Sequence, residues 1–144
     1  MLREVIPDFW RSSEEETYFA LKEDGLTIFR TIICLRRKLP VWWPPDSNMG
    51  PNEVTYLHFP VPPSFAPTCP ERILELLRNV LPYVDLPVLF FCKEGKNRTG
   101  MIAAIIKYFH SGCFSGSLNE YLEGVSGAHR ESELVIIKKL AKKN

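Results

Sequence analysis

The pattern of apolar and polar positions predicts a chain of alternating helices and short buried strands. Apolar, β-branched residues fill 27–35, a looser alternation covers 54–60, and a fully apolar run covers 87–91. Short runs of this kind predict strands, and the third is typical of a central parallel strand. A stripe of apolar residues predicts a helix ending near Pro82, and the strongly apolar residues 99–110 predict another.

Two helix starts carry the pattern of a capping box, in which a Ser or Thr and a Glu three residues later satisfy backbone N–H groups. Ser13 and Glu16 form the first pattern, and we expect its helix to stop at Gly25. Thr68 and Glu71 form the second. Both patterns place acidic residues where they complement the helix dipole.

Two further helices are predicted near the end of the sequence, a short one over 117–124 and an amphipathic one from Glu131 onward. The expected order is then helix, strand, strand, helix, strand, loop and three helices. This order predicts an α/β fold with a mostly parallel central sheet flanked by helices. With no internal repeat and no linker, we expect a single domain over residues 1–144.

Composition limits the kinds of partner that the chain can bind. The 144 residues suffice for a core without disulfides or metal, and the net charge is only +1. A general attraction of the whole surface to nucleic acid or to an anionic membrane is therefore not expected. Any anion site must be local.

The cysteines and histidines show no metal-binding pattern. The four cysteines lack a CxxC pair and the three histidines lie far apart, so no metal and no cofactor is expected. The first residues lack the apolar region of a signal peptide, and no segment approaches 18 apolar residues. We expect a soluble, monomeric, cytoplasmic protein whose cysteines remain thiols.

The segment after the central strand has the composition of an anion site. In open α/β sheets, ligands bind at the carboxyl ends of strands, where helix N-termini point. Backbone N–H groups of such a loop can converge on one phosphate, and the planar fork of Arg98 can grip two of its oxygens. The expected phosphate-binding residues are Lys93, Glu94, Gly95, Lys96, Asn97 and Arg98.

Cys92 stands at the start of this loop. The N–H groups and the helix dipole that favour phosphate also favour a thiolate, which would be a nucleophile aimed at phosphorus. Thr99 is placed to hydrogen-bond the thiolate or the departing phosphate. The competing interpretation, a structural cysteine on a surface turn, is disfavoured by the strand before the loop and the apolar helix after it.

The segment CKEGKNRTG (92–100) resembles the signature loop of the cysteine-dependent protein tyrosine phosphatases. FWRSSEE (9–15) and RTIICLR (30–36) are similar to segments of the compact dual-specificity phosphatases. NEYLEG (119–124) and AHR (128–130) are similar to their atypical plant-and-fungal branch. The resemblance implies a tyrosine phosphatase fold, Cys92 as nucleophile with a phosphocysteine intermediate, Arg98 as phosphate clamp and Thr99 as helper in hydrolysis.

Two positions depart from the family pattern. Phe91 stands where the family has a His that orders the loop, and residues 58–68, where the family has an acidic residue, contain no Asp or Glu. Asp46 ends the sequence WWPPD, which resembles an acid loop but lies early in the chain, so it is one candidate general acid. Glu71 is expected to cap a helix, and His58 to be a strand residue, with a role as the general acid as the lesser alternative.

The missing acid bears on the substrate. General acid catalysis matters most for a poor leaving group and less when one phosphate leaves from another. Phosphate monoesters, such as phosphotyrosine, remain the main hypothesis, and phosphoanhydrides, such as inositol pyrophosphates or an RNA 5′-triphosphate, are the alternative. His129 and Arg130 are either second phosphate contacts or a solvated turn. A pseudophosphatase that binds phosphorylated partners without turnover is a third hypothesis.

Two features remain open on the sequence alone. The loop 38–51 is rich in proline, and its Trp42 and Trp43 either cap a binding cleft or cover an apolar surface. Cys34 occupies the strand position where the resembled family has an Asn next to the loop, so we expect it near Cys92. It is either a redox partner that protects the thiolate through a reversible disulfide, or a small buried core residue.

Overall fold

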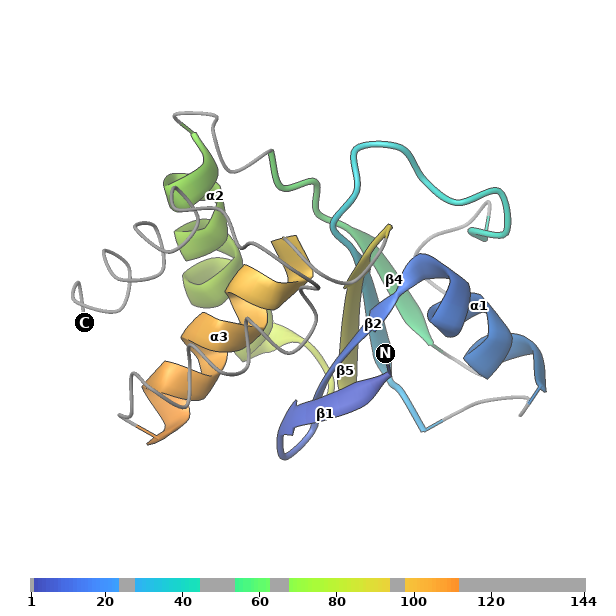
Figure 1. Cartoon of the computed structure of the whole chain (residues 1–144), viewed down its shortest axis with the longest axis horizontal. Helices are drawn as coiled ribbons and strands as arrows, with labels where there is room; N and C mark the ends of the chain where they lie inside the picture. Colours follow the sequence, from blue (N-terminus) through green and yellow to red (C-terminus); the bar gives the residue numbers. More distant parts are fainter. Residues whose placement is uncertain (1, 24–27, 45–53, 63–67, 94–97, 112–144) are drawn as a thin grey trace, which may run out of the picture.

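The fully apolar run of the sequence forms the central strand of a five-stranded sheet, with the order β1-β2-β5-β3-β4 (Figure 1). The computed structural model describes residues 2–23, 28–44, 54–62, 68–93 and 98–111. All five residues of β5 (Val88–Cys92) are buried, as expected for a strand covered on both faces. β2 (Phe9–Ser13) and β3 (Thr31–Cys34) pair with it in parallel on either side.

The outer strands complete a mostly parallel sheet. β4 (Thr55–His58) is parallel to β3, and β1 (Arg3–Ile6) is antiparallel to β2. The predicted strands at 27–35, 54–60 and 87–91 are confirmed, although the first begins later, at Thr31. The predicted architecture of a mostly parallel sheet with flanking helices is confirmed as well.

The N-terminal hairpin of β1 and β2 was not predicted, because the expected order began with a helix. Its strands are short, and β2 buries two polar residues, Arg11 and Ser12, which hide the apolar pattern of a strand. Asp8 turns the chain between the strands with a φ of 72°, a conformation that Asp tolerates better than most residues. Its N–H donates to the Glu4 carboxylate at 3.0 Å.

The first capping box is confirmed. The Ser13 N–H donates to Glu16 Oε1 at 2.9 Å, and the Glu16 N–H donates to Ser13 Oγ at 3.1 Å. These bonds begin α1 (Glu14–Glu23), which extends from the end of β2. The expected stop at Gly25 lies outside the described residues.

The second capping box was predicted wrongly. Thr68 precedes α2 (Cys69–Glu75), but its φ of −85° and ψ of −6° are helical, and its side chain makes no capping hydrogen bond. The helix continues through a π-helical turn (Leu76–Val80) and a 3₁₀ turn (Leu81–Tyr83), which agrees with the predicted end near Pro82.

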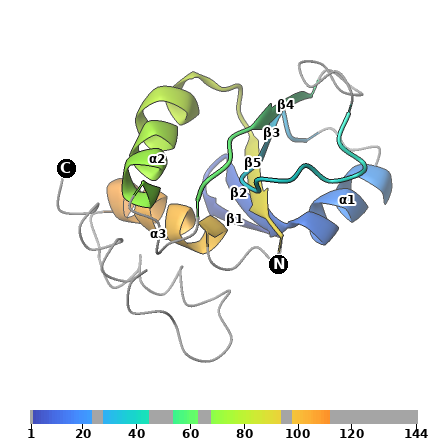
Figure 2. The same ribbon diagram turned by 90° about the horizontal axis from the view of Figure 1, so that it is seen from above.

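The two faces of the sheet are covered by different elements (Figure 2). α1 and the chain after β3 lie on one face, whereas α2 and α3 (Arg98–Ser111) lie on the other. Alternation along β5 divides its side chains between two clusters, with Phe90 and Cys92 toward the helices α2 and α3. Leu89 and Phe91 point toward the face of α1. The predicted helices at 117–124 and from Glu131 lie outside the described residues.

None of the helices in the described part of the chain has the length and apolar character that crossing a membrane requires.

Candidate active site

Cys92 lies at the carboxyl end of the central strand, where the sequence places it. In the sheet register it is opposite Ser13 of β2, and the preceding Phe91 carbonyl accepts the Leu35 N–H at 2.9 Å. The Cys92 side chain is 4% exposed and belongs to the cluster shared with α2 and α3. The strands on both sides therefore fix the point at which the predicted phosphate-binding loop begins.

Arg98 is the first residue of α3, on the far side of this loop. Its Nη1 donates to the Val61 carbonyl at 3.1 Å, and the Val61 N–H donates to the Leu35 carbonyl at 3.0 Å. The guanidinium is thereby held toward the segment that follows β4. A guanidinium has five N–H donors, so this one bond leaves donors for a phosphate.

Thr99 is fully buried in the first turn of α3. Among the described residues, no group forms a hydrogen bond with its Oγ1. Buried hydroxyl groups are nearly always hydrogen-bonded, so this one can take a partner that the described residues do not supply. The thiolate or a bound phosphate would be such a partner.

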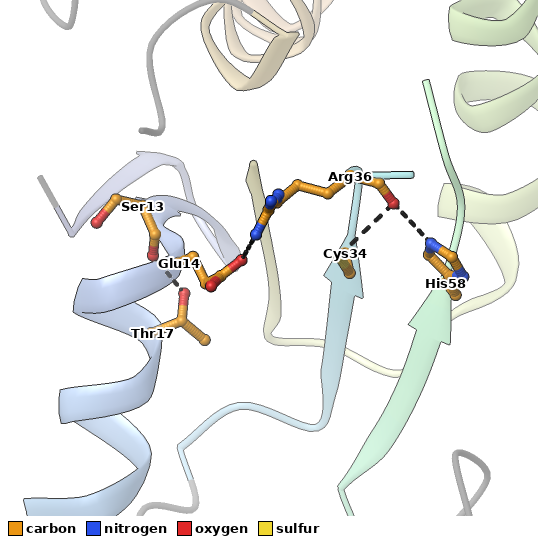
Figure 3. A network of polar contacts seen from close by, with 6 residues as sticks. All are labelled: Ser13, Glu14, Thr17, Cys34, Arg36 and His58. Atoms are coloured by element: carbon orange, nitrogen blue, oxygen red, sulfur yellow. Dashed lines mark hydrogen bonds and ion pairs between the residues drawn. The ribbon is translucent and has the colours of Figure 1, made fainter. Parts of the chain in front are cut away.

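Glu14 and Arg36 join the segments that follow β2 and β3 (Figure 3). The Glu14 N–H donates to the carbonyl of Lys93 at 3.2 Å, and the Glu14 carboxylate forms an ion pair with Arg36. The Arg36 carbonyl in turn accepts hydrogen bonds from the Cys34 thiol at 3.9 Å and from His58 Nε2 at 2.6 Å.

The sequence reasoning did not name Glu14 or Arg36 as site residues. Glu14 was assigned to the helix dipole, and Arg36 was only part of the RTIICLR resemblance. The signal that could have revealed them is their position, since Glu14 follows directly on β2, Arg36 lies two residues beyond β3, and both strands flank β5. Residues at the ends of adjacent parallel strands meet at one edge of the sheet.

Phe91 lies on the opposite face from Cys92, beneath two tryptophans. Its ring centroid is 5.8 Å from that of Trp42 and 6.2 Å from that of Trp43. Trp43 also packs edge-on against Tyr56 at 5.2 Å. Of the two hypotheses for the tryptophans, this packing supports the one in which they cover an apolar surface.

Cys34 faces the same side of the sheet as Phe91, with which it is paired in the register. Burial raises the pKa of the Cys34 thiol to about 11, and the nearby Glu14 carboxylate and Cys92 act in the same direction. The two cysteines are thus close enough to interact electrostatically, although their side chains start from opposite faces. A disulfide between them stays a prediction.

The general acid is not identified by the described residues. Asp46 lies outside them, as do loop residues Glu94, Gly95, Lys96 and Asn97 and the proposed second contacts His129 and Arg130. Glu71 is exposed on α2, although it does not cap it as predicted. His58 is exposed at the end of β4 and bonds to Arg36.

Part of the chain is similar to known phosphatases. Residues 47–109 match the tyrosine phosphatase family. An inositol diphosphatase of Oryza sativa subsp. japonica, DSP1, is 34% identical over 64 residues, which are 44% of this chain and 29% of that protein. An inositol diphosphatase of Arabidopsis thaliana, DSP5, is 27% identical over 113 residues, 75% of this chain and 54% of that protein. The chain therefore spans about half or less of the length of these relatives.

The same fold is found in a solved structure. The core catalytic domain of the PP-IP phosphatase SIW14 from S. cerevisiae superimposes with a TM-score of 0.69. The match covers 99% of this chain and 91% of that one, at 19% sequence identity. This agreement over nearly the whole chain shows that the two proteins share their fold.

Proposed function

We propose that this chain is a cysteine-dependent phosphatase of the tyrosine phosphatase family, which the match over residues 47–109 and the fold shared with a PP-IP phosphatase support. One observation carries the proposal. Cys92 ends the central strand and Arg98 begins α3, so the two residues bracket a loop at a helix N-terminus. A nucleophile and a bidentate anion clamp on either side of such a loop form a site for phosphoryl transfer.

The proposed reaction has two steps. The Cys92 thiolate attacks phosphorus, an S–P bond forms, and the P–O bond to the leaving group breaks, so that the leaving oxygen departs with the bonding electron pair and takes up a proton. Water then attacks the phosphocysteine, the S–P bond breaks, and phosphate and the thiolate are released. Arg98 and the loop N–H groups hold the phosphoryl oxygens in both steps.

Thr99 has a separate role in this scheme. Its buried hydroxyl can donate to the sulfur, which stabilises the thiolate as a leaving group in the second step. Thr99→Val keeps the shape of the side chain but removes the donor. We expect it to slow hydrolysis of the phosphocysteine more than its formation, so the intermediate accumulates during turnover.

The substrate that the comparisons favour is a phosphoanhydride on a small polyphosphorylated molecule. Both relatives are named as inositol diphosphatases. A departing phosphate group needs less help from a general acid than an alkoxide does, which fits a chain without an acidic residue in 58–68. The family match supports the second candidate, hydrolysis of phosphate monoesters such as phosphotyrosine in proteins.

Phosphate release from a panel of substrates tests these functions. The panel contains an aryl phosphate, a phosphotyrosine peptide, a phosphoserine peptide, an inositol pyrophosphate and a triphosphate-ended RNA, each also tested with Cys92→Ser. We expect turnover of the inositol pyrophosphate and its loss in Cys92→Ser. Turnover of the aryl phosphate and phosphotyrosine alone would support the monoester function and would make Asp46 the next residue to mutate.

Arg98→Lys provides a second test of the site. A lysine keeps the positive charge but loses the planar pair of donors, so we expect a loss of about 10²-fold or more in kcat/KM. A wild-type protein that binds phosphorylated ligands but releases no phosphate from any substrate would show a pseudophosphatase instead.

A further inference from the structure

The residue directly before the nucleophile is held by aromatic packing. Phe91 is completely buried, and its ring lies against Trp42, with centroids 5.8 Å apart and an angle of 31° between the planes. Trp43 contacts the same ring at 6.2 Å and is itself 9% exposed. The two tryptophans belong to the segment that follows β3, far from Phe91 in the sequence.

These tryptophans are anchored on two further elements. The Trp42 ring lies 6.0 Å from Tyr18 of α1, and the Trp43 ring lies 5.2 Å from Tyr56 of β4. The backbone N–H of Trp43 also donates to the Pro40 carbonyl at 3.1 Å, which closes a turn in the segment that carries both tryptophans. The aromatic layer of these rings thus joins α1, β4 and the segment after β3 to the last part of β5.

A phenyl ring at position 91 cannot position the loop by hydrogen bonding, because it has neither donor nor acceptor. What fixes the side chain of Phe91 is therefore the packing of its ring, since cores hold side chains in single rotamers by close contact. Its backbone is fixed separately, by the bond from the Leu35 N–H to its carbonyl at 2.9 Å. Any tilt of Phe91 moves Cys92, which follows it directly on the strand.

We propose that Trp42 and Trp43 are positioning residues for the Cys92 nucleophile, acting through the ring of Phe91. They belong to the cluster on the opposite face of the sheet from Cys92, and they set the direction in which the end of β5 presents the sulfur. The proposal rests on the proposed function only in that Cys92 is the reacting group. Small displacements of a nucleophile are costly because a shift of about 1 Å can reduce a rate by about 10²-fold.

The experiment compares Trp42→Leu with Trp10→Leu, a matched control. Trp10 packs against the same cluster and makes an edge-on pair with Phe29 at 5.7 Å. Trp10 lies opposite Leu89 in the register, and Leu89 is three residues before Cys92. We therefore expect Trp10→Leu to disturb the packing of the core without displacing Cys92. Both variants are checked for folding by circular dichroism and urea denaturation.

Two readouts are followed for each variant, the alkylation rate of Cys92 by iodoacetamide at fixed pH and the kinetics on an aryl phosphate. For Trp42→Leu we expect both kcat and the alkylation rate to fall by about 10-fold or more, with KM changed far less. For Trp10→Leu we expect both to stay within about 2-fold of wild type, at a similar loss of stability. Trp42→Phe keeps an aromatic ring on Phe91 and should restore most of the rate.

Equal effects of the Trp42 and Trp10 variants, or an unchanged rate in Trp42→Leu, would overturn the proposal. If Trp42→Leu does not fold, the comparison of Trp42→Met with Trp10→Met decides in the same way, since only Trp42→Met should slow the alkylation of Cys92. The alkylation readout does not require turnover. A wild type without phosphatase activity would therefore refute the proposed function and still leave the positioning role testable.

Discussion

The Glu14 N–H donates to the Lys93 carbonyl at 3.2 Å, so the first residue of α1 is joined to the first loop residue after Cys92. The Glu14 carboxylate also pairs with Arg36, which lies just beyond the end of β3. Through these two contacts, the elements on both sides of β5 are joined to the residue that follows Cys92. The Glu14–Arg36 ion pair should therefore affect both the stability of the fold and the position of the residue after Cys92.

Removing this ion pair should cost little stability by itself. The side chains of Arg36 and Glu14 are 21% and 24% exposed, and exposed pairs contribute up to about 1 kcal/mol. We expect Glu14→Gln and Arg36→Gln each to lower the free energy of unfolding by about that amount, and the double variant to lose less than the sum. Urea denaturation of the four proteins measures this coupling.

The control for this cycle is Glu75→Gln, which breaks the more exposed pair with Arg72 on α2. This change should leave loop-dependent properties, such as the affinity for inorganic phosphate, unaltered. In contrast, Glu14→Gln should weaken phosphate binding. Strict additivity of the Glu14 and Arg36 variants would show that the two side chains do not interact in solution.

The two capping patterns of the sequence should differ in their contribution to stability. Ser13→Ala removes the acceptor for the Glu16 N–H, and loss of such a cap costs about 0.5–2 kcal/mol. Thr68→Ala removes a side chain that makes no capping bond, so we expect a change within about 0.5 kcal/mol. Thermal and urea denaturation of both variants compare them directly, and similar losses would contradict the observed geometry.

Phe91→His should destabilise the protein, although His is the residue that the resemblance to the tyrosine phosphatases leads one to expect at this position. The imidazole would be buried beside Trp42 and Trp43, and an unsatisfied buried polar group costs about 1–3 kcal/mol. The cost should grow below about pH 6.5, where the unfolded chain binds a proton that the buried ring resists. Urea denaturation at several pH values measures both effects.

Phe91→Leu is the matched control for this prediction. It shortens the aromatic contact but adds no polar atom, so its cost should not depend on pH in this range. A stable Phe91→His protein would mean that the imidazole finds a hydrogen-bonding partner near the loop.

The elements with a simple periodicity could be predicted from the sequence, and those that bury polar groups could not. The central strand is uniformly apolar, so β5 and the position of Cys92 at its end could be predicted. The apolar residues after the loop likewise predicted α3. β2 was missed because Arg11 and Ser12 are buried in it. Polar residues in so short a strand interrupt the apolar pattern by which a strand is recognised in a sequence.

Sequence patterns also could not tell which local contact forms. Ser13-x-x-Glu16 and Thr68-x-x-Glu71 are equivalent as sequences, but only Ser13 makes the capping bond, because Thr68 takes a helical backbone conformation. The packing of Trp42 on Phe91 was equally hidden. Contacts between residues far apart in the chain depend on the tertiary structure that the pattern alone does not specify.

The high pKa of the Cys34 thiol predicts how its reactivity and the protein's stability depend on pH. Burial raises this pKa to about 11, whereas an unfolded cysteine has a pKa near 8.5. At pH 8, Cys34 should therefore remain a thiol and react with iodoacetamide far more slowly in the native protein than in urea. Peptide mass spectrometry measures its alkylation alongside that of Cys92.

The same shift determines the direction of the stability change. Above about pH 8.5 the unfolded chain loses the Cys34 proton before the folded one does, so the stabilising contribution is complete below that pH and declines as pH rises toward about 11. Cys34→Ala should remove this part of the decline, which urea denaturation at pH 7.5, 9 and 10 would measure. A Cys34–Cys92 peptide after mild peroxide would confirm the redox hypothesis, and its absence would leave Cys34 as a core residue.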